Sequence, residues 1–228
     1  MNFEYVDMES FPRREQFEHF RNMAFPCVGF TVNMDITKFR REIKERGWPF
    51  FHTLLYRTVW AANSVPEIRQ RIRGDRIVQY DFCEASYTLA LPDETYCYCH
   101  LRFDMPFEEF LPYAEKVKAR ALEERSMDDG DDFEGYFFVS SVPWISFTSA
   151  IQPMDIPADG IPRFLFGKFF EQGDKILLPV CVLTHHALTE GGTFQNFIKG
   201  FSSFLTEKND KTKAGTFFYK TGRLFFFI

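Results

Sequence analysis

Residues 177–192, LLPVCVLTHHALTEGG, decide how this chain is interpreted. The stretch begins with an apolar run that is typical of a buried strand, and it leads directly into His185 and His186. Gly191 and Gly192 favour a tight turn, and a helix is predicted after them. Strand ends on a rigid scaffold are common places for reactive side chains. The two histidines are therefore the first candidates for chemistry, although an ordinary strand end would also fit the pair alone.

Sequence patterns on both sides of this stretch alternate between helices and strands. The predicted helices are residues 12–22, 36–46 (with Asp35 as N-cap and Gly47 as its end), 50–64, 106–124 and 193–205. The predicted strands are residues 27–33, 77–80, 86–91, 96–103, 137–142, 145–148, 160–170 and 175–184, the last two forming a hairpin around 171–174. This order predicts an α/β protein of the two-layer α+β kind, with helices packed on a mixed, largely antiparallel sheet.

The 228 residues are enough for one domain with a sizeable core or for two small domains. The sequence has no internal repeat and no low-complexity linker, so we expect a single domain over residues 1–206. Composition changes in residues 207–228, which are first polar and then apolar in FFYKTGRLFFFI. The pattern leaves open whether this tail adds a strand, crosses to another subunit or stays disordered.

Composition and charge exclude several classes of protein. The net charge of −5 and the lack of a basic stripe argue against a nucleic-acid partner. No apolar run approaches the roughly 18 residues of a membrane-spanning helix. The five cysteines are odd in number and follow no secretory leader, which predicts a cytoplasmic protein with reduced thiols. The 30 phenylalanines fit either a large core or a pocket for a flat, apolar ligand.

Two segments contain residue types that bind metals, but the pattern of neither fits a metal site. Cys97, Cys99 and His100 are close in sequence, but strand alternation places the two cysteines on one buried face. The acidic run of residues 128–132 lacks the glycine and glutamate placement of a calcium loop. We therefore predict no metal site.

Several co-linear motifs resemble the chloramphenicol acetyltransferase family. The family's signature is two histidines, three residues, an aspartate and a glycine, and residues 185–191 read HHALTEG. In the same order as in the family, the chain has FPRREQF at 11–17, Pro26-Cys27, SSVPW at 140–144, QGD at 172–174 and LLP at 177–179. The resemblance covers roughly residues 1–206.

This resemblance implies a CoA-dependent acyltransferase fold and activity. Members of the family move an acetyl group from acetyl-CoA to a hydroxyl, without a metal, an acyl-enzyme intermediate or a permanently bound cofactor. They are homotrimers whose active sites lie between subunits. His186 matches the general base that removes the hydroxyl proton, and Ser140 matches the donor that stabilises the tetrahedral oxyanion.

Other positions match supporting roles in the family. Arg13 and Glu190 match a structural ion pair, with glutamate where the family has aspartate. We expect this pair to be buried and important for stability. Phe20 and Leu165 fall in the acceptor pocket, where tyrosine and threonine are common, so the pocket becomes more apolar. Three positions match CoA contacts, namely Trp144, Lys168 and Phe169.

Three functions are compatible with these motifs. The first is acetylation of chloramphenicol, which would confer antibiotic resistance. The second is the same reaction on another hydroxyl acceptor, favoured by Glu190, Leu165 and Phe20. The third is a non-catalytic trimeric binding protein that keeps the fold, because fold alone does not specify activity.

Overall fold

The computed structural model describes residues 1–206. The helices of this part are α1 Arg14–Phe20, α2 Thr37–Arg46, α3 Phe50–Asn63, α4 Phe107–Glu124 and α5 Gly191–Thr206, with short 3-10 helices η1 Pro66–Arg69 and η2 Phe133–Gly135. The strands are β1 Phe3–Tyr5, β2 Cys27–Asp35, β3 Gln70–Arg73, β4 Arg76–Tyr80, β5 Glu84–Ala90, β6 Tyr96–Leu101, β7 Tyr136–Ser141, β8 Arg163–Phe166, β9 Phe170–Gln172 and β10 Lys175–His185.

The main sheet has the strand order β2-β10-β8-β7-β5-β6, and β9 pairs with the start of β10. Strand β7 runs parallel to β5 and β8, and all other pairs in this sheet are antiparallel. The predicted mixed, largely antiparallel sheet is therefore confirmed. Strand β10 pairs with β2 over its last nine residues and with β8 and β9 on its other side, which fixes the strand that leads to the histidines.

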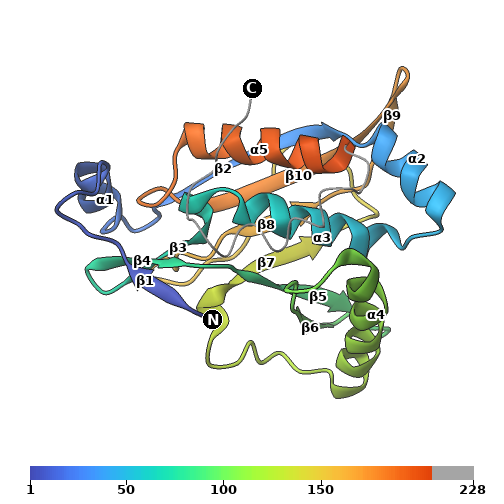
Figure 1. The fold of residues 1–228 in the computed structure, drawn as a ribbon, viewed down its shortest axis with the longest axis horizontal. Helices are drawn as coiled ribbons and strands as arrows, with labels where there is room; N and C mark the ends of the chain where they lie inside the picture. The colour runs from blue at the N-terminus through green and yellow to red at the C-terminus, as the bar shows by residue number, and fades with distance from the viewer. Residues whose placement is uncertain (207–228) are drawn as a thin grey trace.

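Helices α3, α4 and α5 pack against one face of the main sheet (Figure 1). Strand alternation sends one set of side chains into this core, as with Phe164 and Phe166, which are both buried. Leu165, between them, points to the other face and is half-buried. Helix α3 lies deepest, and most of its residues are buried, including charged Arg57. The phenylalanines thus largely form a core, which was one of the two interpretations of their high number.

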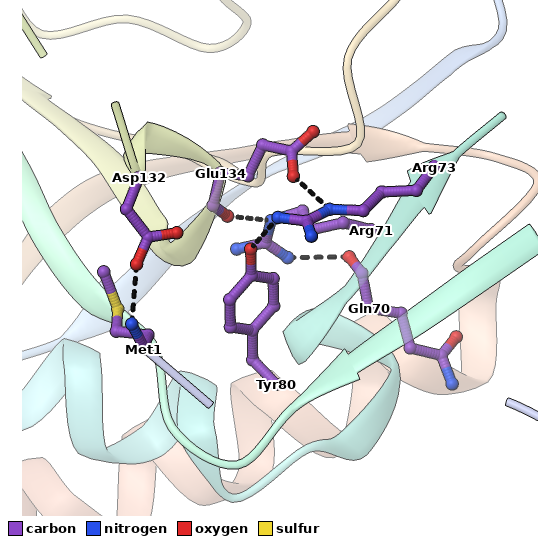
Figure 2. A network of polar contacts seen from close by, with 7 residues as sticks. All are labelled: Met1, Gln70, Arg71, Arg73, Tyr80, Asp132 and Glu134. Carbon is purple, nitrogen blue, oxygen red and sulfur yellow. Dashed lines mark hydrogen bonds and ion pairs between the residues drawn. The ribbon is translucent and has the colours of Figure 1, made fainter. Parts of the chain in front are cut away.

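A small second sheet, in the order β1-β4-β3, lies beside the main one. It supports the start of β7 through Arg71, whose fully buried guanidinium donates hydrogen bonds to the carbonyls of Glu134 at 2.7 Å and Tyr136 at 2.9 Å. Arg73 reinforces this contact with an ion pair to the Glu134 carboxylate at 2.6 Å. Figure 2 draws the network, which comprises Met1, Gln70, Arg71, Arg73, Tyr80, Asp132 and Glu134.

The small sheet also supports the turn that follows β10. Leu188 of this turn forms a separate apolar cluster with Ala187, Phe17 of α1 and Ile77 of β4. Gly160 lies between Leu188 and Arg71, where an added Cβ would come within 3.0 Å of the Leu188 side chain and 3.2 Å of the Arg71 Cα. Only glycine fits this approach without movement of its neighbours.

Most predicted elements are confirmed within a few residues, and several predictions need correction. The predicted strand at 145–148 is wrong: residues 142–162 are irregular, because β8 occupies the place beside β7. The predicted strand at 160–170 is divided into β8 and β9. Asp35 is not the N-cap, because Ile36 holds that position, but the Asp35 carboxylate accepts a hydrogen bond at 3.0 Å from the amide of Thr37, the first residue of α2. Strands β1 and β3 were not predicted.

The predicted end of α2 and the predicted burial of the β6 cysteines are confirmed. Gly47 closes α2 with a φ of 68°, in the left-handed region that glycine tolerates best. Cys97 and Cys99 are both buried, as alternation in β6 predicts. The domain boundary at residue 206 stays a prediction, and the tail 207–228 lies outside the described residues.

Candidate active site

The histidine pair stands at the end of β10. His185 is the last strand residue and pairs with Cys27 of β2. The His186 amide then donates to the Pro26 carbonyl at 2.7 Å, and the chain turns over residues 186–188. Gly191 already belongs to α5, and an added Cβ there would meet no atom within 4 Å. The tight-turn role predicted for the glycines is therefore wrong, because the preceding residues make the turn.

The His186 ring is half-buried and held on two sides. Its Nδ1 lies 2.9 Å from the Thr189 carbonyl oxygen. Because a carbonyl can only accept, Nδ1 carries the proton in the neutral ring, and Nε2 presents a lone pair. The Phe20 ring stacks on the imidazole, with centroids 4.0 Å apart and an angle of 20° between planes. No described residue forms a hydrogen bond with Nε2, so this nitrogen is free to accept a proton from a ligand.

His185 has a different environment from its neighbour. Its side chain is 1% exposed, and its Nδ1 accepts the Ala187 amide at 3.2 Å. Burial lowers the pKa of His185 to about 4, since removal from water disfavours the charged ring. This residue is therefore a neutral structural histidine that helps to shape the turn carrying His186.

Arg13 holds the turn mainly through backbone carbonyls. Its guanidinium donates to the carbonyl oxygens of Leu188 at 2.5 Å and His186 at 3.3 Å. The predicted partner Glu190 lies farther away, with Oε1 4.0 Å from Arg13 Nε and a side chain that is 55% exposed. The predicted ion pair is therefore present but long, and the expectation that it is buried is wrong, because the Glu190 side chain is largely exposed. Arg13 Nε has no hydrogen-bond partner among the described residues.

Ser140 lies near the other end of the main sheet, on β7. Its Oγ is 2.9 Å from Thr88 Oγ1 of β5, and the residue is half-buried. Leu165 of β8 is directly beside it in register. All three side chains project from the face of the sheet opposite the helices, because strand neighbours such as Val139 are in the core. Sequence reasoning missed Thr88, since its proximity to Ser140 depends on the pairing of β5 with β7.

The three predicted CoA contacts gather beyond the same end of β7 and β8. Trp144 is 63% exposed, and Lys168 is also exposed. The Lys168 amide donates to the Ile145 carbonyl at 2.7 Å, which brings the segment after β7 against the link between β8 and β9. Phe169 is half-buried and packs on the main core.

Within one chain, His186 and Ser140 lie far apart. Ser140 is level with Leu165, which is level with Cys181 of β10, so it is two strands away from β10. His186 follows Cys181 by five residues. With strands about 4.8 Å apart and a rise of about 3.3 Å per residue, the two Cα atoms are separated by about 19 Å. A single copy therefore presents its candidate residues in two separate places, which we call the histidine end and the serine end of the sheet.

Two further findings concern other kinds of site. In residues 1–206, no three His, Cys, Asp or Glu side chains are grouped so that they could hold a metal ion. Over the same residues, no helix is both long and apolar enough to cross a membrane.

Sequence comparison matches the chloramphenicol acetyltransferase family over residues 1–202. The chain is 29% identical to chloramphenicol acetyltransferase 2 of Escherichia coli over 201 residues, covering 87% of this chain and 94% of that protein. It is 32% identical to the chloramphenicol acetyltransferase of Clostridium perfringens over 203 residues, covering 86% of this chain and 92% of the relative.

Solved structures share the fold. A chloramphenicol acetyltransferase superposes with a TM-score of 0.78 at 23% identity, covering 90% of this chain and all of that one. The dihydrolipoamide acetyltransferase of Azotobacter vinelandii superposes with a TM-score of 0.62 at 14% identity, covering 85% and 86% of the two chains. The arrangement of helices on a mixed sheet is thus the one seen in these acyltransferases.

Proposed function

The chain belongs to the chloramphenicol acetyltransferase family, and we propose that it moves the acetyl group of acetyl-CoA to a hydroxyl of chloramphenicol with His186 as general base. The observation that carries the role of His186 is its hydrogen bond to the Thr189 carbonyl. That bond fixes the proton on Nδ1 and leaves Nε2 as an acceptor at the edge of a half-buried ring. A hydroxyl is a weak nucleophile at neutral pH, and such a base overcomes this limitation.

The reaction is a direct transfer. Nε2 of His186 takes the hydroxyl proton as the acceptor oxygen attacks the thioester carbonyl carbon. The carbonyl oxygen becomes a tetrahedral oxyanion, which the Ser140 hydroxyl stabilises with a hydrogen bond. When the C–S bond breaks, the imidazolium returns its proton to the leaving thiolate. The products are the acetyl ester and free CoA, and His186 is again neutral.

Thr88 supports the role of Ser140. The two hydroxyl oxygens are 2.9 Å apart, and either can donate. If Thr88 donates, the Ser140 hydrogen is free to point at the oxyanion. A second hydroxyl of this kind orients the donor before the reaction begins, which is the condition for effective oxyanion stabilisation.

We propose that the active site forms between copies of the chain, in a homotrimer. The separation of about 19 Å between His186 and Ser140 supports this, because reacting groups must come within about 3–3.5 Å of the same substrate atoms. A symmetric ring of three brings the histidine end of one copy to the serine end of the next. Each of the three interfaces then completes one site.

The donor is acetyl-CoA, which binds as a co-substrate and leaves as CoA, so no cofactor stays bound. Trp144, Lys168 and Phe169 hold it at the serine end. We place the protein in the cytoplasm, where acetyl-CoA is made and where its five free cysteines stay reduced. Residues 1–206 form the catalytic domain in this proposal.

Thiol release from acetyl-CoA tests the activity. The purified protein with chloramphenicol should release one CoA thiol for each ester formed, and a folded protein that releases none would rule the activity out. A mixture of refolded His186→Gln and Ser140→Ala subunits tests the assembly. Each variant alone is nearly inactive, but mixed trimers contain intact interfaces and should regain about a quarter of the wild-type activity. Sites contained in one chain would give no recovery.

The acceptor itself has a second candidate, another hydroxyl compound with a more apolar surface. Leu165 stands directly beside Ser140, and Phe20 offers a ring without a hydroxyl against His186. Neither side chain can hydrogen-bond an acceptor or a bound water. If chloramphenicol is inert and an apolar alcohol is acetylated in a panel of acceptors, the second candidate is correct.

A further inference from the structure

Helix α2 is strongly basic in an acidic protein. Its ten residues, TKFRREIKER, include five cations and two acids, whereas the whole chain carries a net charge of −5. One of the acids, Glu42, is already paired with Arg57 at 2.6 Å. Arg40 and Lys44 are four residues apart on the same side of the helix, an arrangement of like charges that destabilises an isolated helix. The region therefore attracts anions.

Arg40 has a defined position on this helix. The carbon of its guanidinium lies 4.6 Å from the centroid of the Phe169 ring and 5.4 Å from that of Phe50. These rings are 5.8 Å apart, so the guanidinium rests against both of them. Among residues 1–206, no side chain or carbonyl accepts a hydrogen bond from it and no carboxylate pairs with it. Stacking on an aromatic face fixes the guanidinium plane and leaves its N–H edge available.

The surroundings of Arg40 suit a ligand that combines phosphate and apolar groups. Lys168, next to Phe169 in the chain, is exposed and also forms no ion pair with a described residue. Its amide bonds to the carbonyl of Ile145, which is 50% exposed and follows the exposed Trp144. Two cations without an ion-pair partner among residues 1–206, a half-buried ring and exposed apolar side chains thus lie on three adjoining segments, which are α2, the stretch after β7 and the β8–β9 link.

We propose that Arg40 is a specificity-determining residue that binds a phosphate group of the acyl donor together with Lys168, with Phe169 holding the guanidinium in place. The inference rests on the proposed function, because the donor is CoA. Arginine can donate two parallel hydrogen bonds to phosphate, which a lysine cannot. Lys168 was recognised in the sequence, but Arg40 was not, since its link to Phe169 exists only in the folded protein.

Binding measurements with Arg40→Met test the proposal. Methionine keeps an apolar chain over Phe169 and removes the charge. Titration calorimetry should show CoA binding weakened about tenfold, at the lower end for a charge-assisted contact because the site is partly solvated. Arg41→Met is the matched control: Arg41 is exposed on the same helix and contacts no ring, so the change should be less than about twofold. Higher salt should weaken the wild type more than Arg40→Met.

Two smaller ligands identify the phosphate. If the loss disappears with 3′-dephospho-CoA, Arg40 binds the 3′-phosphate; if it persists there but disappears with pantetheine, Arg40 binds the pyrophosphate. Either result supports the proposal. The proposal is overturned if the CoA affinity of Arg40→Met is unchanged, or if the loss of affinity is equally large with pantetheine. In either case, CoA binding by the wild type leaves the proposed function standing. A wild type that does not bind CoA contradicts the proposed function itself.

Discussion

The histidine end and the serine end of the main sheet are built in different ways. At the histidine end, one turn is restrained in four ways. The His186 ring stacks on Phe20 and bonds to the Thr189 carbonyl, the Arg13 guanidinium donates to the backbone of the turn, and Leu188 packs in a separate apolar cluster. At the serine end, Ser140 has one hydroxyl neighbour, and Trp144 and Lys168 are largely in solvent. This difference fits the proposed roles, because a general base must be held in one tautomer and orientation before the reaction, whereas the proposed CoA-binding surface can stay open until a ligand covers it.

The largest effect should come from replacing the base. His186→Gln should lower kcat by about 10²–10⁴, because glutamine cannot accept the hydroxyl proton. Its amide can still donate to the Thr189 carbonyl, so the turn should keep its shape. The assay is steady-state acetylation, with CoA affinity as a check of folding. Phe20→Leu is the control, since it removes only the stacked ring. A His186→Gln rate within tenfold of wild type would exclude general-base catalysis by this residue.

The next largest effect should come from the serine end. Ser140→Ala should reduce kcat by about 10²–10³ through loss of one oxyanion donor. The KM for acetyl-CoA should change little, because the donor acts mainly in the transition state. Thr88→Val, which removes only the neighbouring hydroxyl, should give a smaller loss. An increase in KM with kcat unchanged would show instead that Ser140 binds the ground state.

The sequence predicts the two ends unequally well. The strand, the paired histidines and the following helix are consecutive in residues 175–206, so local pattern is sufficient to predict β10, the turn and α5. The prediction of a strand at 145–148 failed because this segment has no strand partner, since β7 already pairs with β5 on one side and β8 on the other. Pairing partners are set by topology, which a local pattern does not contain.

Candidate residues follow the same rule. His186, Ser140, Arg13 and Lys168 came from motifs. The contacts that give them meaning, such as Thr88 beside Ser140, come from strands or helices distant in the sequence. The distance between His186 and Ser140 could also not be predicted from their spacing in the sequence, because it follows from the register of three strands. Sequence therefore proposed the groups, and the fold shows which of them lie close together in one copy of the chain.

The burial of His185 predicts a pH effect on stability. The pKa of His185 is lowered by burial from 6.5 to about 4. Between these values the unfolded chain binds a proton that the folded chain excludes, so the free energy of unfolding should fall by roughly 3 kcal/mol as pH drops from about 6.5 to about 4. His185→Gln should remove this part of the acid dependence. The measurement is urea unfolding at several pH values.

The control for this effect is His19→Gln, which makes the same replacement at an exposed histidine outside β10 and its turn. Other groups that titrate in this range contribute equally to wild type and variant, so the difference between the two profiles isolates His185. Parallel profiles would show that the His185 ring takes up a proton in the folded protein.

The smallest effects on stability and kcat should come from Arg13 and Glu190, and they separate what each residue contributes to the turn. Arg13→Met removes the donors to the carbonyls of Leu188 and His186, and leaving buried acceptors without a donor costs about 1–3 kcal/mol. The turn should relax, so kcat should fall together with the free energy of unfolding. Glu190→Gln should cost less than about 0.5 kcal/mol, since a largely exposed carboxylate 4.0 Å away contributes little.

Urea unfolding and kcat of both variants decide this point. A much larger cost for Arg13→Met than for Glu190→Gln would mean that the histidine end depends on the guanidinium and the backbone, so that glutamate in place of aspartate is tolerated. Equal costs would mean that the ion pair closes in solution and that Glu190 shares in holding the turn. The ratio of the two costs therefore measures how far the rigidity of the histidine end comes from charge pairing and how far from hydrogen bonds to its own backbone.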